Sequence, residues 1–236
     1  MIEISKLLPV FFKILNTKDI NYAILRGYEK LPDEISNDID FGVHPNDFIK
    51  FTLFINNYFH KYEGVINIDL VRLDVVKYVI NIKNLEPIKI DVWTSMNFCG
   101  LYYVDLMQAL NNRVLYNDSI YIIPQNYEIS ISLLKELLHN SGVREDKKAN
   151  IISKFSYFSI KQPLMKFFNE YCINQISNAL FHKRITFVAL SFYLKLNLLK
   201  TNISHFGLYK TLKNICLFIT IKYFNQNYYK TIFSNI

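Results

Sequence analysis

The first 125 residues combine one clear helical pattern with several apolar runs of strand length. Apolar positions recur at helical spacing over residues 4–15. Pro45 predicts the first turn of a second helix, which reaches about Phe59. Runs rich in β-branched and aromatic residues predict strands at residues 22–25, 38–43, 65–73, 75–82, 88–93 and 119–123.

The remainder of the chain changes to helical spacing. Residues 29–37 are polar and predict a loop, and the short breaks between the strands of residues 65–93 allow an antiparallel meander. From Leu101 onward the pattern is helical apart from the last strand, with an amphipathic helix at 127–138 and four or five helices over 144–236. The predicted fold class is therefore α+β, with a mixed sheet and flanking helices over residues 1–125 and an all-helical domain over residues 126–236.

Composition indicates a folded protein, because 51% of the residues are hydrophobic and 16% are aromatic. Six glycines in 236 residues argue against a glycine-rich nucleotide-binding loop. Cys99, Cys172 and Cys216 are far apart without metal-site spacing, which predicts buried free thiols in a reducing compartment. No signal-peptide pattern is present, and no uncharged run approaches the roughly 20 apolar residues of a spanning helix. We therefore expect a cytoplasmic protein.

Charge is divided unequally along the chain. Residues 1–150 contain 16 Lys and Arg against 19 Asp and Glu, whereas residues 151–236 contain 11 against a single acid, Glu170. A basic half indicates an acidic partner, although AT-rich coding would also enrich lysine. Lysine mixes with aromatic residues at 181–184, 193–195 and 221–224. Those segments fit ordinary core, peripheral contact at the inner membrane face or, least favoured, a nucleic-acid groove.

Three aspartates are the strongest candidates for chemistry. Asp38 and Asp40 flank Ile39 on one predicted strand, so their carboxylates point to the same face of a sheet. Asp91 lies on a later strand, and we prefer it to Asp69, a competing acid on a neighbouring strand. Carboxylates brought together repel each other unless a divalent cation or a shared proton offsets the repulsion. The pattern therefore predicts a hard-metal phosphoryl-transfer site.

The order of elements around these acids resembles the nucleotidyltransferase fold superfamily, which includes DNA polymerase beta-like enzymes. The chain runs helix, strand, glycine turn, Asp-x-Asp strand, helix, strands and a final Asp strand. The segment LRGYEKLPDEISNDIDFGV looks most like small bacterial members of surface-polysaccharide gene clusters. The resemblance covers residues 1–125 well and the helical remainder loosely.

The resemblance implies an enzyme that uses two Mg²⁺ ions and a nucleoside triphosphate. Asp38 and Asp40 would hold the two ions, and Asp91 would help to hold one and would orient or deprotonate the attacking hydroxyl. A nucleoside monophosphate would pass to a small-molecule or glycan acceptor, and pyrophosphate would leave. The superfamily usually places Gly or Ser after its first glycine, whereas this chain has Arg26-Gly27-Tyr28, where Arg26 would bind phosphate instead.

The helical half adds second candidates through the resemblance. Related enzymes often turn a basic residue of the helical domain toward the triphosphate, and Arg144, Lys147 and Lys148 would take that role here. The alternative is a solvated helix start, with Glu145 and Asp146 as local partners.

Other interpretations stay open. Asp38 would then cap a turn, Asp40 would pair with a lysine or arginine, and Asp91 would pair with Lys89 or Arg26. His139 ends an apolar helix and is expected to cap it more often than to act in catalysis. Rival functions are a toxin-like transferase that modifies tRNA or protein, a non-catalytic binding protein on the same fold, and a membrane-surface module with an inert sheet.

Overall fold

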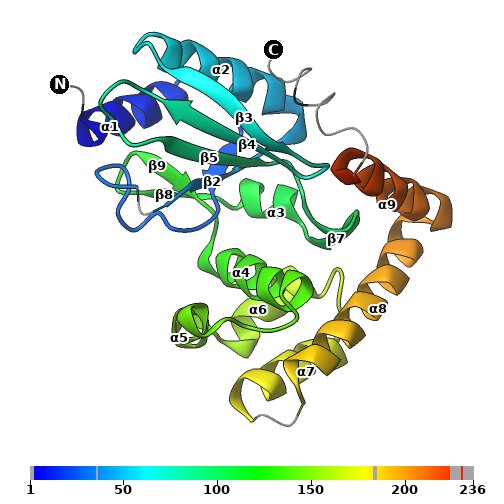
Figure 1. The fold of residues 1–236 in the computed structure, drawn as a ribbon. Helices are drawn as coiled ribbons and strands as arrows, with labels where there is room; N and C mark the ends of the chain where they lie inside the picture. The colour runs from blue at the N-terminus through cyan, green and yellow to red at the C-terminus, as the bar shows by residue number, and fades with distance from the viewer. Residues whose placement is uncertain (1–2, 36, 183–184, 224–229, 231–236) are drawn as a thin grey trace. The chain divides into compact units, whose positions relative to one another are not determined.

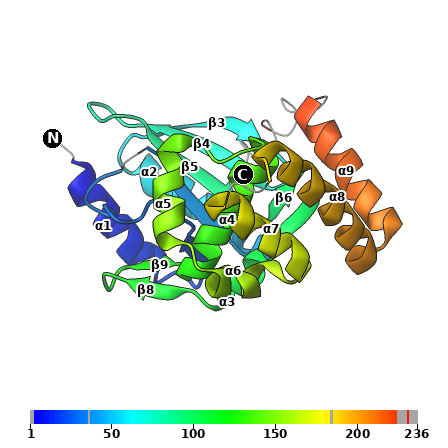
Figure 2. The same ribbon diagram turned by 90° about the horizontal axis from the view of Figure 1, so that it is seen from below.

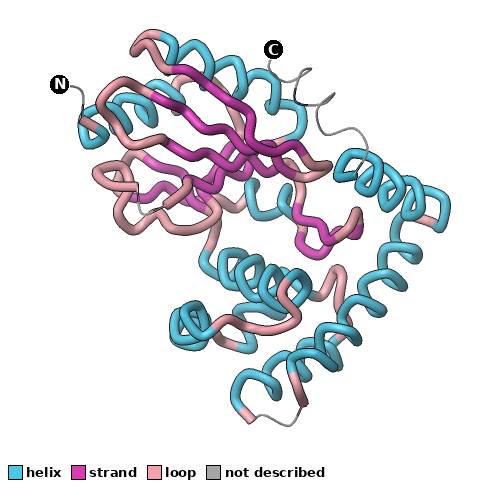
Figure 3. Tube along the Cα trace, viewed as in Figure 1, coloured by secondary structure: helices cyan, strands magenta, loops and turns pink. Residues whose placement is uncertain are grey.

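The computed structural model describes residues 3–35, 37–182, 185–223 and 230. It confirms the predicted fold class, because a mixed sheet with helices comes first and a helical region follows (Figures 1 and 3). The helices are α1 (Ile4–Leu15), α2 (Phe48–His60), α3 (Leu106–Asn111), α4 (Gln125–His139), α5 (Glu145–Lys154), α6 (Tyr157–Leu164), α7 (Glu170–Phe181), α8 (Phe187–Phe206) and α9 (Leu208–Tyr223), and the short 3₁₀ turn η1 (Pro45–Asp47) precedes α2. The strands are β1 (Tyr22–Ile24), β2 (Ile39–Val43), β3 (Val65–Val71), β4 (Val75–Asn81), β5 (Ile88–Trp93), β6 (Met96–Phe98), β7 (Leu101–Val104), β8 (Val114–Tyr116) and β9 (Ile120–Ile122).

The chain divides into two compact units. The first comprises Met1–Ser95, Leu106–Pro124 and Ile219–Ile236, and the second comprises Met96–Asp105 and Gln125–Phe218. The hairpin of β6 and β7 thus belongs with the helices of the second unit, although α3, β8 and β9 of the first unit follow it along the chain.

The first unit is built on a seven-stranded sheet in the order β3-β4-β5-β2-β1-β9-β8. Strands β2 and β5 are parallel, as are β1 and β9, and the other neighbours are antiparallel. The sheet is therefore mixed, and β3, β4 and β5 form the predicted antiparallel meander. In this order β2 and β5, which carry the candidate acids, lie side by side near the centre of the sheet.

Helices α1 and α2 cover one face of this sheet (Figure 1). Phe11 of α1 lies against Phe41 of β2 and against Phe54 and Phe59 of α2, with ring centroids 5.1–6.2 Å apart. Since side chains alternate along a strand, Phe41 faces this aromatic core and Asp40 faces the other side of the sheet. The helix-covered face thereby fixes the direction of the candidate acids.

Two short strands depart from the helical pattern expected from Leu101 onward, and a third, just before it, was not predicted. Strands β7 and β8 lie in that region and β6 lies just before it, so the prediction is wrong there. Runs of three or four residues are too short to show strand alternation. Cys99 and Gly100 link β6 and β7 with φ of 51° and 85°, the two positive values that a tight hairpin turn requires. A Cβ on Gly100 would lie 2.6 Å from the backbone oxygen of Asn214, so glycine is required there.

The second unit is mainly helical. Helix α4 packs against α5, α6 and α8, and α7 packs against α6 and α8 (Figure 2). Asn202 of α8 joins the helices to β7, because its side chain accepts from the Tyr102 amide and donates to the Tyr102 carbonyl, each at 2.9 Å. Within the described residues, α5 to α9 give the five helices that the pattern allowed.

The thiols agree with the prediction only in part. Cys172 is buried, but Cys216 is exposed on α9 and Cys99 is partly exposed, so the expectation of buried thiols is wrong for Cys216. Of the basic aromatic segments, Lys183, Arg184 and Phe224 lie outside the described residues. In the described part of the chain, no helix has both the length and the apolar character needed to cross a bilayer.

Candidate metal centre

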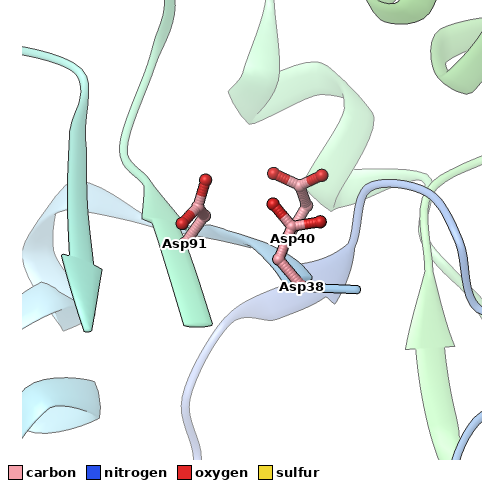
Figure 4. Close-up of side chains that lie close together, drawn as sticks. All are labelled: Asp38, Asp40 and Asp91. Carbon is pink, nitrogen blue, oxygen red and sulfur yellow. The ribbon is translucent and has the colours of Figure 1, made fainter. Parts of the chain in front are cut away.

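The three predicted aspartates meet on two adjacent parallel strands. Asp40 of β2 and Asp91 of β5 are register partners, and Asp38 lies immediately before β2. Each residue offers a carboxylate oxygen, and these oxygens all lie within 4.8 Å of one another. Figure 4 shows the three side chains projecting to the same side of the sheet. The structure therefore brings together the three acids that the sequence singled out.

Burial makes it costly to keep the carboxylates of this cluster ionised. Asp40 and Asp91 are each 3% exposed, while Asp38 is partly exposed. Burial raises the pKa of Asp91, the nearby carboxylates of Asp40 and Asp38 raise it further, and the Lys77 ammonium only partly offsets them. A raised carboxyl pKa means that the ionised form is disfavoured where it stands. Desolvation is the largest cause of this shift, so the raised pKa reflects the burial of Asp91 beside other acids.

Asp40 is held through both of its oxygens. The Arg26 guanidinium donates from Nε to Oδ2 at 2.5 Å, and the Trp93 indole donates from Nε1 to Oδ1 at 2.8 Å. Trp93 lies two residues after Asp91 on β5, so its side chain is on the same face of the sheet. Arg72 in turn lies over the Trp93 ring, with its guanidinium carbon 6.0 Å from the ring centroid. These contacts fix the orientation of the Asp40 carboxylate.

Asp91 forms an ion pair with Lys77, its antiparallel register partner on β4. The Lys77 ammonium donates to Oδ2 of Asp91, and the lysine side chain remains 30% exposed. The ion-pair interpretation is therefore confirmed for Asp40 and Asp91. The partner of Asp91, however, is Lys77, and not Lys89 or Arg26 as expected. Lys89 is exposed on β5. The ion pairs and the acidic cluster therefore do not exclude each other, because the same aspartates take part in both.

The donor set fits a hard divalent cation. All three donors are carboxylate oxygens, the ligands that Mg²⁺ and Mn²⁺ prefer. Two donors bound to one ion at roughly 2.0–2.6 Å lie at most about 4–5 Å apart, and the three carboxylate oxygens lie within that limit. The cluster could therefore hold metal ions, with Lys77 and Arg26 moving aside from the oxygens that they contact.

The Arg26-Gly27-Tyr28 turn lies at the end of β1. Gly27 has φ of 69° and is exposed, and a Cβ there would meet nothing within 4 Å, so backbone conformation and not space favours glycine. The Tyr28 ring packs edge-on against Tyr116 of β8, with centroids 5.0 Å apart. The tyrosine ring is thus engaged in packing, while the Gly27 backbone stays accessible.

The second-tier candidates have local partners. Lys147 and Lys148 lie on α5 in the second unit, 3.9 Å from Asp146 and 3.2 Å from Glu145. These are the local acids that the solvated-helix interpretation named. His139 is the last residue of α4, and its ring lies edge-on to Phe98 at 5.1 Å.

The competing acid and the third basic candidate also have clear positions. Asp69 is exposed at a β-bulge of β3, on the far side of β4 from Asp91. Arg144 pairs with the buried Glu136 through two nitrogens, at 2.9–3.2 Å.

Lys77 and Trp93 are the site neighbours that sequence reasoning missed. Both depend on strand register, which the apolar pattern does not give. A signal was present, however, because Asn84 occupies the turn between β4 and β5 with φ of 65°, and Lys77 and Asp91 are equally far from it along the chain. A hairpin centred on Asn84 would have paired the two.

Comparisons with known proteins add little. No protein-family model matches the chain, and no curated protein matches it. Among solved structures, an antigenic nucleotidyltransferase-like protein from Paracoccidioides brasiliensis is similar with a TM-score of 0.45 and 18% sequence identity, over 82% of this chain and 92% of that one. Likeness at this level assigns neither an activity nor a residue role to this chain.

Proposed function

We propose that this protein is a Mg²⁺-dependent nucleotidyltransferase that moves a nucleoside monophosphate from a nucleoside triphosphate to a small-molecule or glycan acceptor. The observation that carries the proposal is the cluster of Asp38, Asp40 and Asp91, whose ligand oxygens lie within 4.8 Å of one another. The order of strands and acids along the chain supports the same function.

Each acid has a distinct role in this proposal. Asp38 and Asp40 would hold two Mg²⁺ ions, and Asp91 would complete the site. The bound ions would stabilise negative charge on the phosphates as Lewis acids. Asp91 would take the proton of the acceptor hydroxyl, whose oxygen bonds to the α-phosphorus as the bond to pyrophosphate breaks. Burial raises the pKa of Asp91, which makes its carboxylate a stronger base than that of an exposed aspartate.

Phosphate contacts would come from the turn after β1. The Gly27 backbone is exposed, and Arg26 lies beside Asp40, which supports a role for both in binding a phosphate at the cluster. The sequence resemblance alone extends a phosphate-binding role to Tyr28, Lys147 and Lys148. Arg26 would exchange its carboxylate partner for a phosphate oxygen.

Nucleotide binding and turnover are tested separately. The melting temperature of the full chain is measured with Mg²⁺ and each of ATP, GTP, CTP and UTP. We expect an increase with at least one nucleotide, which is lost in Asp40→Asn and kept in Asp69→Asn, a matched control at an exposed acid of the same sheet. Pyrophosphate release is then followed with that nucleotide and a panel of sugars and sugar phosphates.

The outcomes separate the rival functions. Label from the α-phosphate on tRNA or protein would favour the toxin-like transferase, and nucleotide binding without pyrophosphate release would favour a non-catalytic binding protein. No stabilisation of the wild-type protein by any nucleotide would contradict the proposal.

An exposed apolar stripe on α8 supports a membrane partner. Val188, Phe192 and Leu196 are four residues apart and 68%, 65% and 52% exposed, and no acid follows Glu170 in the sequence. We assign this stripe to peripheral contact with an anionic bilayer, where an acceptor on a lipid would be reached. We expect the protein to float with anionic vesicles and not with zwitterionic ones. The double variant Phe192→Ser/Leu196→Ser should no longer float. Equal flotation of the wild type and the double variant would contradict this role. A place in surface-polysaccharide synthesis rests on the sequence resemblance alone.

A further inference from the structure

Lys77 occupies the position where a cation would be needed to neutralise Asp91. It lies directly across from Asp91 on the neighbouring strand and donates to Oδ2, so no loop movement is required for the contact. The Asp91 side chain is 4% exposed and the lysine side chain is 30% exposed. The lysine side chain is thus partly exposed, while the acid that it contacts is buried.

In this arrangement Lys77 and a metal ion would compete for the same oxygen of Asp91. A metal ion that coordinates Oδ2 of Asp91 must displace the ammonium, because two cations at one oxygen repel each other. A lysine side chain is flexible, and that of Lys77 is partly exposed, so it can withdraw without disturbing the strand. Nearby, the polyphosphate of a nucleotide would offer the displaced ammonium a new anionic partner.

We propose that Lys77 is an internal counterion that occupies Asp91 until a metal ion arrives together with a nucleotide. The lysine keeps the metal-free cluster folded, weakens binding of metal alone, and makes metal binding depend on nucleotide. This inference rests on the proposed function, from which it takes the metal and the nucleotide.

The single tryptophan of the chain makes the test direct. Trp93 donates to Oδ1 of Asp40, so a metal ion on Asp40 should change the indole fluorescence. Mn²⁺ is titrated into the full chain without nucleotide, and isothermal calorimetry supplies an independent affinity. We compare the wild type with Lys77→Met, which removes the competing ammonium.

Lys89 provides the matched control. It lies two residues before Asp91 on β5, on the same face, and is exposed. Lys89→Met thus removes one positive charge near the cluster without removing the contact to Asp91. We expect Lys77→Met to bind Mn²⁺ at least about tenfold more tightly than the wild type, equivalent to about 1.4 kcal/mol. Lys89→Met and the charge-preserving Lys77→Arg should stay close to the wild type.

A second readout covers the case in which Lys77→Met does not fold. In the wild-type protein, acetylation of the Lys77 amine should speed up relative to Lys89 when Mn²⁺ is added, because metal releases the ammonium from Asp91. Mass spectrometry of the labelled peptides gives both rates.

The outcomes are separable. Unchanged or weaker Mn²⁺ binding by Lys77→Met, an equal gain in Lys89→Met, or slower acetylation of Lys77 with metal would overturn the counterion role alone. Absence of any Mn²⁺ binding by wild type and variants would overturn it together with the metal site. A gain in Mn²⁺ affinity without nucleotide transfer would leave the counterion role standing and count against the proposed function.

Discussion

Both units of this protein bury carboxylates, but they neutralise them differently. In the second unit Glu136 is 4% exposed and pairs with Arg144, and Glu128 pairs with Lys154 at 3.1 Å. Each of these glutamates has its own cation. In the first unit Asp40 and Asp91 also have cations, Arg26 and Lys77, but they lie in one cluster with Asp38, and the neighbouring acids raise the pKa of Asp91.

The pKa values of Glu136 and Asp91 are shifted in opposite directions. Burial alone would raise the pKa of Glu136, but hydrogen bonds from Arg144 and Asn140 outweigh it and hold that pKa below its ordinary value. The pKa of Asp91 is raised despite its lysine partner. An acid whose hydrogen-bonded cation lowers its pKa supports the fold, whereas a buried acid whose pKa is raised beside other acids costs stability when it is ionised and is a candidate for chemistry. Burial of an acid alone does not separate the two cases.

The largest expected effect tests the functional side of the comparison. Asp40→Asn should weaken Mn²⁺ binding by at least about 100-fold, because it removes a proposed direct ligand, and changes of outer-shell residues alone cost about 10–100-fold. Glu136→Gln, an equally conservative change at a buried acid of the second unit, should leave Mn²⁺ affinity unchanged. Calorimetric titration of both variants checks this. Equal losses in the two would remove the distinction between cluster and ion pair.

The next effect tests the structural side. Arg144→Ala leaves the buried Glu136 without its guanidinium, so the free energy of unfolding should fall by about 2 kcal/mol. The loss should be below the roughly 3–5 kcal/mol of a fully buried pair, because the Arg144 side chain is 55% exposed. Lys147→Ala, at an exposed pair on the same helix start, should change it by less than about 1 kcal/mol. Urea unfolding followed by circular dichroism measures both, and similar losses would contradict the assignment.

Much of the first unit follows from sequence periodicity. Residues 4–15 and the β3–β5 meander are long enough for helical or strand spacing to be unambiguous, and the structure has them close to the predicted bounds. The hairpin of β6 and β7 was missed because its strands are three and four residues long. Its turn depends on positive φ at Cys99, a conformation that non-glycine residues rarely adopt.

The candidate site was predictable up to strand register. Asp38 and Asp40 share a face because side chains alternate, and that holds in any sheet. The pairing of Asp91 with Asp40 requires β5 to lie parallel beside β2, a long-range contact that periodicity cannot give. The partners of the acids, Lys77 above all, follow from register between strands, so they appear only in three dimensions.

A third prediction concerns how the free energy of unfolding changes with pH in the absence of metal: the contributions of Glu136 and Asp91 should have opposite signs. The lowered pKa of Glu136 gives stability that is present above its unfolded value of 4.5 and is lost as pH falls through the lower folded value. The raised pKa of Asp91 works in the opposite direction, since stability falls as pH rises from 3.8 toward the folded value. Thermal unfolding across the acidic range should show Glu136→Gln and Asp91→Asn removing slopes of opposite sign. Slopes of the same sign would contradict the comparison.

The smallest effect compares two single hydrogen bonds. Trp93 donates to Asp40 at 2.8 Å, and the Asn140 amide donates to Glu136 at 3.0 Å. Trp93→Phe should weaken Mn²⁺ binding by roughly threefold to tenfold, about 1 kcal/mol, because the carboxylate loses one of the donors that orient it. Asn140→Ala should lower the free energy of unfolding by a similar amount and leave Mn²⁺ affinity unchanged. Calorimetry and urea unfolding are needed for both variants, since Trp93→Phe removes the fluorescent reporter. If Trp93→Phe altered only stability, the indole would be a structural partner like Asn140, and the orientation of Asp40 would not matter for metal binding.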